Sequence, residues 1–154
     1  MDKTLLFRRA TIKDLSAIVH MLADDDLGSQ RERDEALLPQ TYIRAFNEID
    51  ADKNHELIVA ELNGDVVGTL HLTFLPSISY QGGLRSQVES VRVDSTLRSK
   101  GIGAKMMSHA INRAKERGAY LMQLTSHESR TDAHRFYEQL GFKKAHVGMK
   151  LFLK

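Results

Sequence analysis

A phosphate-binding turn is the clearest chemical feature of this sequence of 154 residues. A β-branched run ending at Val93 is followed by a short polar turn and then by Arg98-Ser99-Lys100-Gly101-Ile102-Gly103-Ala104, which opens a helix. Backbone N–H groups at the start of a helix lack helical partners, and with the helix dipole they attract anions. The two glycines carry no Cβ, so an anion can touch the backbone, and Arg98 and Lys100 add positive charge. We therefore predict that residues 98–104 bind a pyrophosphate group.

Two common phosphate motifs do not fit this turn. The P-loop pattern G-x-x-x-x-G-K-[ST] fails because no glycine lies five positions before Gly103 and because Ala104, not lysine, follows it. The dinucleotide pattern G-x-G-x-x-G fails at its third glycine, where Met106 stands. On these residues alone, a helix start whose glycines serve only tight packing stays the alternative.

A second motif lies further along the chain, in Ala133-His-Arg-Phe-Tyr137-Glu-Gln-Leu-Gly141-Phe142. In order and separation, the two segments resemble the acetyl-CoA loop [QR]-x-x-G-x-G and the A-x-x-[FL]-Y-x-x-x-G-F motif of the GNAT family of N-acetyltransferases. The resemblance extends over nearly the whole chain. One position departs from it, because many relatives carry asparagine three positions before the motif's alanine and this chain has Arg130.

The resemblance implies which residues bind acetyl-CoA. Residues 98–104 would bind its pyrophosphate, and the backbone of the preceding strand would bind its pantetheine arm while the valine side chains pack in the core. The alternatives are an ordinary core strand for the valines and solvated surface charge for the arginine of the last helix. The implied residues are Val91, Arg92, Val93, Arg98, Ser99, Lys100, Gly101, Ile102, Gly103, Ala104 and Arg135.

The resemblance also implies two catalytic residues. Tyr137 occupies the position of the general acid, and a phenol with a pKa near ~10 suits a thiolate leaving group; the alternative is a core aromatic. Glu89 is the candidate base, acting through water. Strict strand alternation would place Glu89 on one face with Val91 and Val93, and Ser90 on the other. A salt bridge to Arg85 or Arg92 is the alternative role for this carboxylate.

Composition narrows the remaining functions. A net charge of +2 and the lack of interleaved aromatic and basic residues argue against a nucleic-acid partner. The absence of cysteine excludes disulfides and an acyl-cysteine intermediate, and no H-E-x-x-H pattern suggests a metal, so we expect none. The first residues contain only a short apolar run before two arginines, which predicts neither a signal peptide nor a membrane span. We expect a cytoplasmic protein.

Hydrophobic periodicity and turn residues predict the elements that position these groups. The Asn63-Gly64-Asp65 sequence indicates a hairpin turn, Thr11 is a candidate helix N-cap, and Gly118 is a helix stop. We expect strands at 5–9, 56–62, 66–74, 87–93 and 121–125, and one or two closing strands from Phe142. Helices are expected after Thr11, from Pro39, at 101–117 and at 131–140. Residues 24–36 are expected to form a loop or an exposed helix, and residues 76–86 a loop.

These observations predict one mixed α/β domain over residues 1–154, with the GNAT fold. Its sheet would be mostly antiparallel, twisted and splayed at the cofactor-binding strand, with about four helices around it. The implied activity is direct transfer of acetyl from acetyl-CoA to a primary amine of a small molecule. A protein or peptide acceptor and a non-catalytic acyl-CoA sensor stay open. Dimers are common in the family, and residues 147–153 would supply an edge for one.

Overall fold

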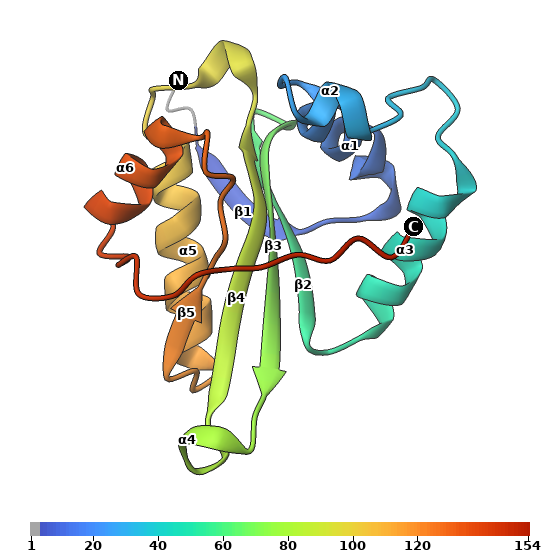
Figure 1. Cartoon of the computed structure of the whole chain (residues 1–154). Coiled ribbons are helices and arrows are strands. Elements are labelled where there is room, and N and C mark those ends of the chain that lie inside the picture. Colours follow the sequence, from blue (N-terminus) through green and yellow to red (C-terminus); the bar gives the residue numbers. More distant parts are fainter. Residues whose placement is uncertain (1–3) are drawn as a thin grey trace.

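The computed structural model describes residues 4–154 (Figure 1). A five-stranded sheet has the order β1-β2-β3-β4-β5, and every neighbouring pair is antiparallel except β4 and β5, which are parallel. This confirms the mostly antiparallel sheet. The elements are β1 (Leu5–Arg9), a 3-10 turn (Ile12–Asp14), α1 (Leu15–Ala23), α2 (Gly28–Arg31), α3 (Gln40–Ala51), β2 (His55–Leu62), β3 (Asp65–Pro76), α4 (Ser79–Gly82), β4 (Leu84–Val93), a second 3-10 turn (Ser95–Leu97), α5 (Ile102–Glu116), β5 (Leu121–Gln123) and α6 (Thr131–Gln139).

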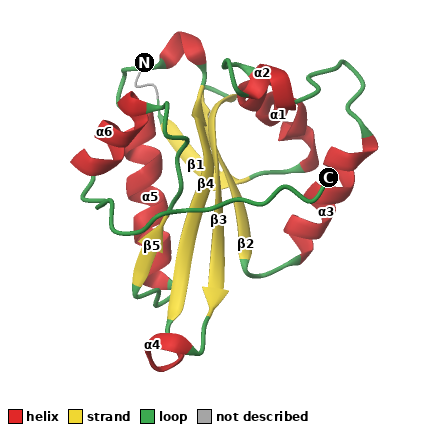
Figure 2. Cartoon of the chain, in the orientation of Figure 1, coloured by secondary structure: helices red, strands yellow, loops and turns green. Residues whose placement is uncertain are grey.

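Helices cover both faces of this sheet (Figure 2). Because strand side chains alternate, β2 and β3 bury residues on each face. One face packs Leu70 against Met106 of α5, and both side chains are fully buried. The other face packs Val59 against Val19 of α1 and Phe46 of α3. The sheet therefore separates an α5 face from an α1 and α3 face.

The turn between β2 and β3 follows its sequence closely. Asn63 and Gly64 have φ angles of 54° and 88°, and Leu62 pairs with Asp65 across the turn. Two successive positive φ angles are what a two-residue type I′ turn requires. The predicted hairpin is confirmed, and it places His71 of β3 opposite β4 farther along the same sheet.

The two parallel strands diverge beside the predicted loop. β5 pairs with β4 only through Arg85, Ser86 and Gln87, and residues 88–93 of β4 continue without a strand on that side. The half-buried side chains Phe136 and Tyr137 of α6 pack against the core cluster that includes this part of β4. The splay predicted at the cofactor-binding strand is therefore present between β4 and β5.

β4 also contains an irregularity that corrects one expectation. Thr69 pairs with Arg92 and His71 with Glu89, so Leu70 faces two residues of β4, and one of them, Ser90, has a φ of 55°. This is a β-bulge, in which one extra residue resets the alternation of side chains. Val91 therefore packs on the α5 face, as Val88 does, while Glu89 points to the opposite face. The prediction that Glu89, Val91 and Val93 share a face was wrong.

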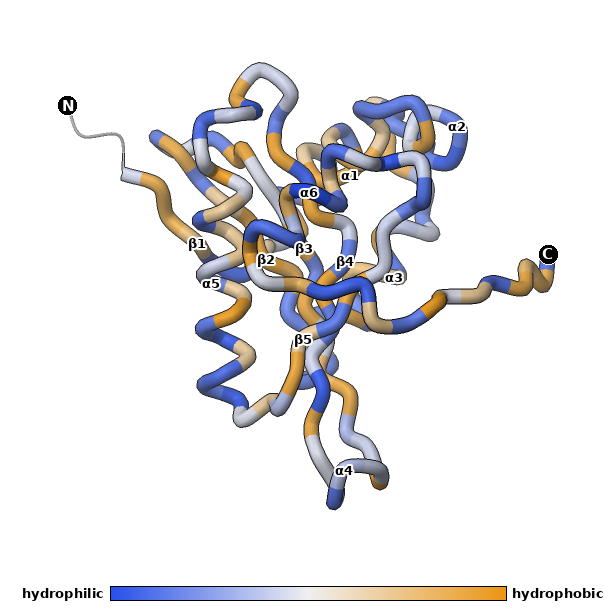
Figure 3. Tube along the Cα trace, turned by 60° about the vertical axis from the view of Figure 1, so that its left-hand side comes forward, coloured by the Kyte–Doolittle hydropathy of each residue, from blue (hydrophilic) through white to orange (hydrophobic). Residues whose placement is uncertain are grey.

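The expected closing strands are absent from the described part of the chain. After α6, residues 143–154, here called the C-terminal segment, form no strand and make no backbone hydrogen bond. Their large apolar side chains are 83% to 92% exposed, and Figure 3 shows the segment standing away from the rest of the chain. A strand requires a neighbour to pair with, and this segment pairs with no strand among residues 4–154. The exposed apolar residues are Val147, Met149, Leu151, Phe152 and Leu153.

Smaller differences concern element ends. Residues 24–36, for which both a loop and an exposed helix were open, contain the short helix α2. The predicted loop at 76–86 contains α4, whose Tyr80 and Gln81 have positive φ angles. β4 begins at Leu84 rather than at residue 87, and β5 ends at Gln123. None of the helices within residues 4–154 is both long enough and apolar enough to cross a bilayer.

Candidate active site

The predicted phosphate loop joins β4 to α5. Asp94 accepts a hydrogen bond from the Thr96 backbone N–H at 2.9 Å, which holds the first turn of the loop. Ser99 and Gly101 then have φ angles of 63° and 80°, and α5 begins at the buried Ile102. Residues 98–101 are exposed, and a Cβ added at Gly101 would have no atom within 4 Å, so the space above the loop is open. The open N-terminus of a fifteen-residue helix is a favourable place for an anion.

The loop lies against α6. A Cβ at Gly103 would lie 3.5 Å from Cζ of Phe136 and 3.8 Å from Cγ2 of Val93. The start of α5, the end of β4 and the middle of α6 therefore converge on one place. Arg135 points elsewhere, because its exposed guanidinium pairs with Asp132 of the same helix. This pairing corresponds to the surface alternative that we considered for Arg135.

Tyr137 lies beside this convergence, at the splay. Its ring makes edge-to-face contacts with Phe136 and Phe142, with centroid separations of 5.1 and 5.9 Å. Burial raises the pKa of Tyr137 above its ordinary value, and the positive charges of Arg92 and Arg130 oppose that rise. The phenol therefore keeps its proton at neutral pH and can donate it. The aromatic packing and the proton donor are compatible in one side chain.

The strand residues before the loop divide between the two faces. Val91 and Val93 pack against the core, as expected for their side chains. The Val91 carbonyl accepts a hydrogen bond from Nη1 of Arg92 at 2.9 Å. Nε of Arg92 lies 3.3 Å from Oδ2 of Asp25, which follows α1, so this guanidinium points to the α1 face.

Glu89 faces a line of histidines on the same side of the sheet. Its Oε1 lies 3.9 Å from Nδ1 of His71, the residue directly opposite on β3. Nε2 of His71 is 2.9 Å from Nδ1 of His55, whose Nε2 is 3.8 Å from Oδ2 of Asp52. Burial lowers the pKa of His71 below its ordinary 6.5, an effect opposed by Glu89 and reinforced by His55. Within residues 4–154, Glu89 forms no salt bridge with Arg85 or Arg92, the two partners that we had considered.

The sequence analysis did not identify Asp25 or His71 as site residues, and it did not predict the contact that Arg130 makes. Nη2 of Arg130 donates a hydrogen bond to Oδ2 of Asp25 at 2.9 Å, across a long separation in the chain. No sequence pattern around either residue predicts this contact. The departure at Arg130 from the family motif was the one available signal.

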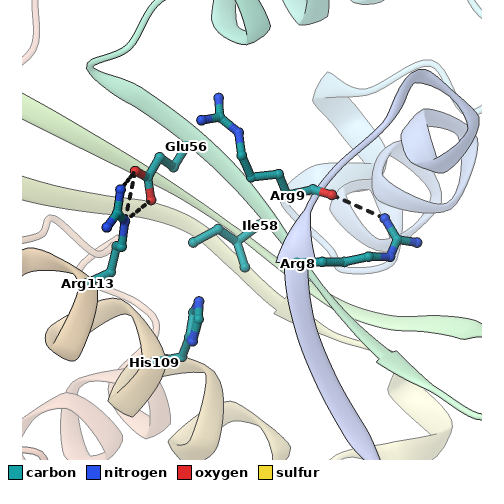
Figure 4. A pocket seen from close by; sticks show the side chains of 6 residues that line it. All are labelled: Arg8, Arg9, Glu56, Ile58, His109 and Arg113. Carbon is teal, nitrogen blue, oxygen red and sulfur yellow. Dashed lines mark hydrogen bonds and ion pairs between the residues drawn. The ribbon is translucent and has the colours of Figure 1, made fainter.

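The hollow drawn in Figure 4 lies elsewhere, between β1, β2 and α5. It has a volume of about 270 Å³ and is lined by arginines, His109, Ile58 and Glu56. Glu56 already accepts hydrogen bonds from Arg113 at 2.8 to 3.0 Å. Neither Tyr137 nor Glu89 lines it, and residues 98–104 are likewise absent from its walls. The hollow therefore does not belong to the candidate site.

Comparisons with known proteins agree with this geometry. The profile of the "Acetyltransferase (GNAT) family" matches residues 18–142. An aminoalkylphosphonate N-acetyltransferase of Salmonella typhimurium is 29% identical over 145 residues, which cover 90% of this chain and 85% of that protein. A glucosamine 6-phosphate N-acetyltransferase of Trypanosoma brucei brucei is 30% identical over 90 residues, covering 58% of this chain and 59% of that protein.

A solved structure agrees over a greater length. A protein of Bacillus halodurans C-125, described as a transcriptional regulator, superposes with a TM-score of 0.95 at 53% identity, covering 97% of this chain and all of that one. The matched profile spans both motifs, the splayed strands and the helices on either side of the sheet. The chain belongs to the GNAT family and is an acetyltransferase.

Proposed function

We propose that the protein transfers an acetyl group from acetyl-CoA to a primary amine of a small molecule. The observation that carries this proposal is the meeting of loop 98–104, the open edge of β4 and Tyr137 at one place, through the packing of Phe136 against Gly103. Both curated relatives described above are named for small amine acceptors that bear a phosphorus oxyanion. Acetyl-CoA supplies the thioester, and without a cysteine in the chain the amine attacks it directly in a ternary complex.

The proposed cofactor contacts follow the shape of the loop. The exposed N-terminus of α5, with Arg98 and Lys100 beside it, offers backbone donors and positive charge to a pyrophosphate. The edge of β4 beyond Gln87 has no strand neighbour on the β5 side, so its backbone is free to pair with the amides of pantetheine. Tyr137 would then lie near the sulfur and give its proton to the departing thiolate.

The proposed base route begins at Glu89. A substrate ammonium must lose a proton before it attacks, and Glu89 takes that proton, directly or through water. His71 lies behind Glu89, and His55 and Asp52 continue the line toward exposed positions. Because the pKa of His71 is lowered by its burial, His71 is neutral at pH 7 and can accept a proton from Glu89.

This route predicts a pH dependence. Protonated His71 cannot accept a proton, so kcat at saturating substrates should be full above the pKa of His71 and should fall as the pH drops through a value below 6.5. The His71→Gln variant should lose this acidic limb and about 10² of the rate at pH 7.5. His20→Gln, which changes an exposed histidine paired with Asp34, is the control and should keep the wild-type profile. An unchanged limb in His71→Gln would remove His71 from the route.

The activity itself is tested by following thiol release from acetyl-CoA with a panel of amino acids, polyamines, aminoglycosides, aminophosphonates and short peptides. Each positive result is checked by detecting the acetylated product. Rapid acetylation of a small amine supports the proposal. Activity confined to peptides would replace it with the protein acceptor, and acetyl-CoA binding without turnover on any amine would favour the sensor.

We also propose that the protein is a homodimer in which the C-terminal segment of each chain pairs with the β5 edge of the other chain. β5 is an edge strand of three residues, so among residues 4–154 each chain offers an unpaired edge at β5 and an unpaired apolar segment after α6. If the two chains exchange these segments, each β5 edge and each apolar segment gains a partner, and the result is a dimer with two-fold symmetry. Gly148 already lies near the end of β5, because a Cβ there would be 3.7 Å from Cγ2 of Thr125.

A further inference from the structure

Positive charge gathers around a single carboxylate at the candidate site. Oδ2 of Asp25 lies 2.9 Å from Nη2 of Arg130 and 3.3 Å from Nε of Arg92. Arg31 of α2 is close enough to act on Arg92 through its charge. Burial alone would raise the pKa of Asp25, but the Gly28 N–H and Arg130 hold it below its ordinary value, so the carboxylate is ionised. One negative charge thus faces at least two positive charges.

The arrangement is costly for the protein alone. The side chains of Arg92, Asp25 and Arg130 are only 15%, 21% and 28% exposed. Nε of Arg92 is buried and, within the described residues 4–154, has no hydrogen-bond partner. Burial and the charge of Arg130 lower the pKa of Arg92, because both make its charged form less favourable. A half-buried cation without a full set of partners is destabilising, and an anionic ligand would relieve this cost.

Arg92 and Arg130 are positioned near the groups that are proposed to act on the acceptor amine. Arg92 lies on the face of β4 to which Glu89 also points, and both arginines are close enough to Tyr137 to oppose the rise of its pKa. The loop at 98–104 has its own basic residues and its own helix N-terminus for the cofactor's pyrophosphate. Arg92 therefore shares a face of β4 with the proposed base, and both arginines are close enough to the proposed acid to act on its pKa.

We propose that Arg92 and Arg130 bind an oxyanion carried by the acceptor amine, namely a carboxylate, phosphonate or phosphate group. This inference rests on the proposed amine acetylation and adds the chemical class of its substrate. Guanidinium groups present paired N–H donors that match such oxyanions. Held there by its acidic group, the substrate would bring an amine a few bonds away to Glu89 and to the thioester. Asp25 is then a positioning residue, which holds both guanidiniums in place.

The test compares amines that share one two-carbon spacing. The substrates are 2-aminoethylphosphonate, O-phosphoethanolamine, β-alanine and the neutral ethanolamine, each assayed for kcat/KM with saturating acetyl-CoA. At least one acidic amine should exceed ethanolamine by roughly 10- to 100-fold, the usual effect of charged hydrogen bonds. The ranking of carboxylate, phosphonate and phosphate identifies which oxyanion the site prefers.

Variants assign the effect to the arginines. Arg130→Gln should raise KM for the preferred acidic amine by about 10-fold or more, and its kcat/KM should fall further for that amine than for ethanolamine, because only the acidic amine carries the oxyanion. The Kd for acetyl-CoA should stay unchanged. Arg130→Lys, which keeps the charge without the paired donors, should recover part of the loss. Arg33→Gln is the matched control, because the side chain of Arg33 is exposed and pairs with Glu35 at the surface. Equal kcat/KM for neutral and acidic amines would overturn the inference, as would a change confined to acetyl-CoA affinity.

Failure of this inference can be separated from failure of the proposed function. Binding of inorganic phosphate and methylphosphonate is measured by calorimetry, with no turnover required. If no amine is acetylated but an anion binds the wild type and not Arg130→Gln, the oxyanion site stands and the proposed reaction fails. If amines are acetylated and neither anion binds nor acidic amines are preferred, the reaction stands and the oxyanion site fails.

Discussion

Replacing Tyr137 with phenylalanine is expected to lower kcat about 100-fold, the usual contribution of one acid–base group, and to leave the Kd for acetyl-CoA unchanged. The substitution removes only the hydroxyl. The ring contacts with Phe136 and Phe142 are made by carbon atoms, so they persist. Within residues 4–154, the Tyr137 hydroxyl makes no hydrogen bond to another protein group, so none would be lost. The fold and the cofactor site should therefore be preserved while the proton donor is removed.

The measurement is steady-state kcat with the best amine of the panel, together with calorimetric binding of acetyl-CoA. Tyr80→Phe is the control, because it removes a hydroxyl from an exposed tyrosine of α4 that stacks on Tyr120 away from the site. Wild-type kcat in the Tyr137 variant would show that thiolate departure needs no help from this phenol. A matching loss in the Tyr80 variant would mean that the assay reports something other than the missing acid.

The second large effect concerns the C-terminal segment. Replacing Leu151 with aspartate should weaken the proposed dimer by about 100-fold or more, because a large apolar side chain buried between chains is worth ~1.5–3 kcal/mol and a buried carboxylate adds a desolvation cost. In the single chain this side chain is 84% exposed, so the protomer fold should not change. The wild type should sediment as two chains at micromolar concentration, and the variant as one.

Lys150→Gln is the matched control for this experiment, because the neighbouring position alternates to the other face of an extended segment. Its dimer should be unchanged. Sedimentation of the wild type as one chain at all accessible concentrations would exclude the exchange. A Leu151→Asp variant that still sediments as two chains would place the dimer interface on another surface.

The sequence predicted best where the determinants are local. Asn63 and Gly64 specify their turn by backbone preference alone, and the glycines at 101 and 103 mark the start of α5 through the same property. The motif containing Tyr137 correctly predicted a helix, α6. These features depend on residues adjacent in the chain, which a pattern can report.

What the sequence did not predict depends on distant partners. The face of Glu89 was assigned by strict alternation, and nothing local reports that Leu70 of β3 would face two residues of β4. The contact of Asp25 with Arg130 joins segments far apart in the chain. The alternating apolar residues from Val147 to Leu153 are typical of a strand, but a strand forms only where a neighbouring edge exists.

Ser90 is the extra residue of the β4 bulge, and the register of the sheet would remain intact without it. Without it, Leu70 would pair with Val91, and β4 would become a regular strand. Val88, Val91 and Val93 would still face α5, so no core side chain would change sides. Such a deletion would remove a residue with positive φ and the local bend that the bulge introduces in β4. The bulge at Ser90 is therefore not what keeps these valines on the α5 face; its effect is to turn Glu89 away from Val91 and toward His71.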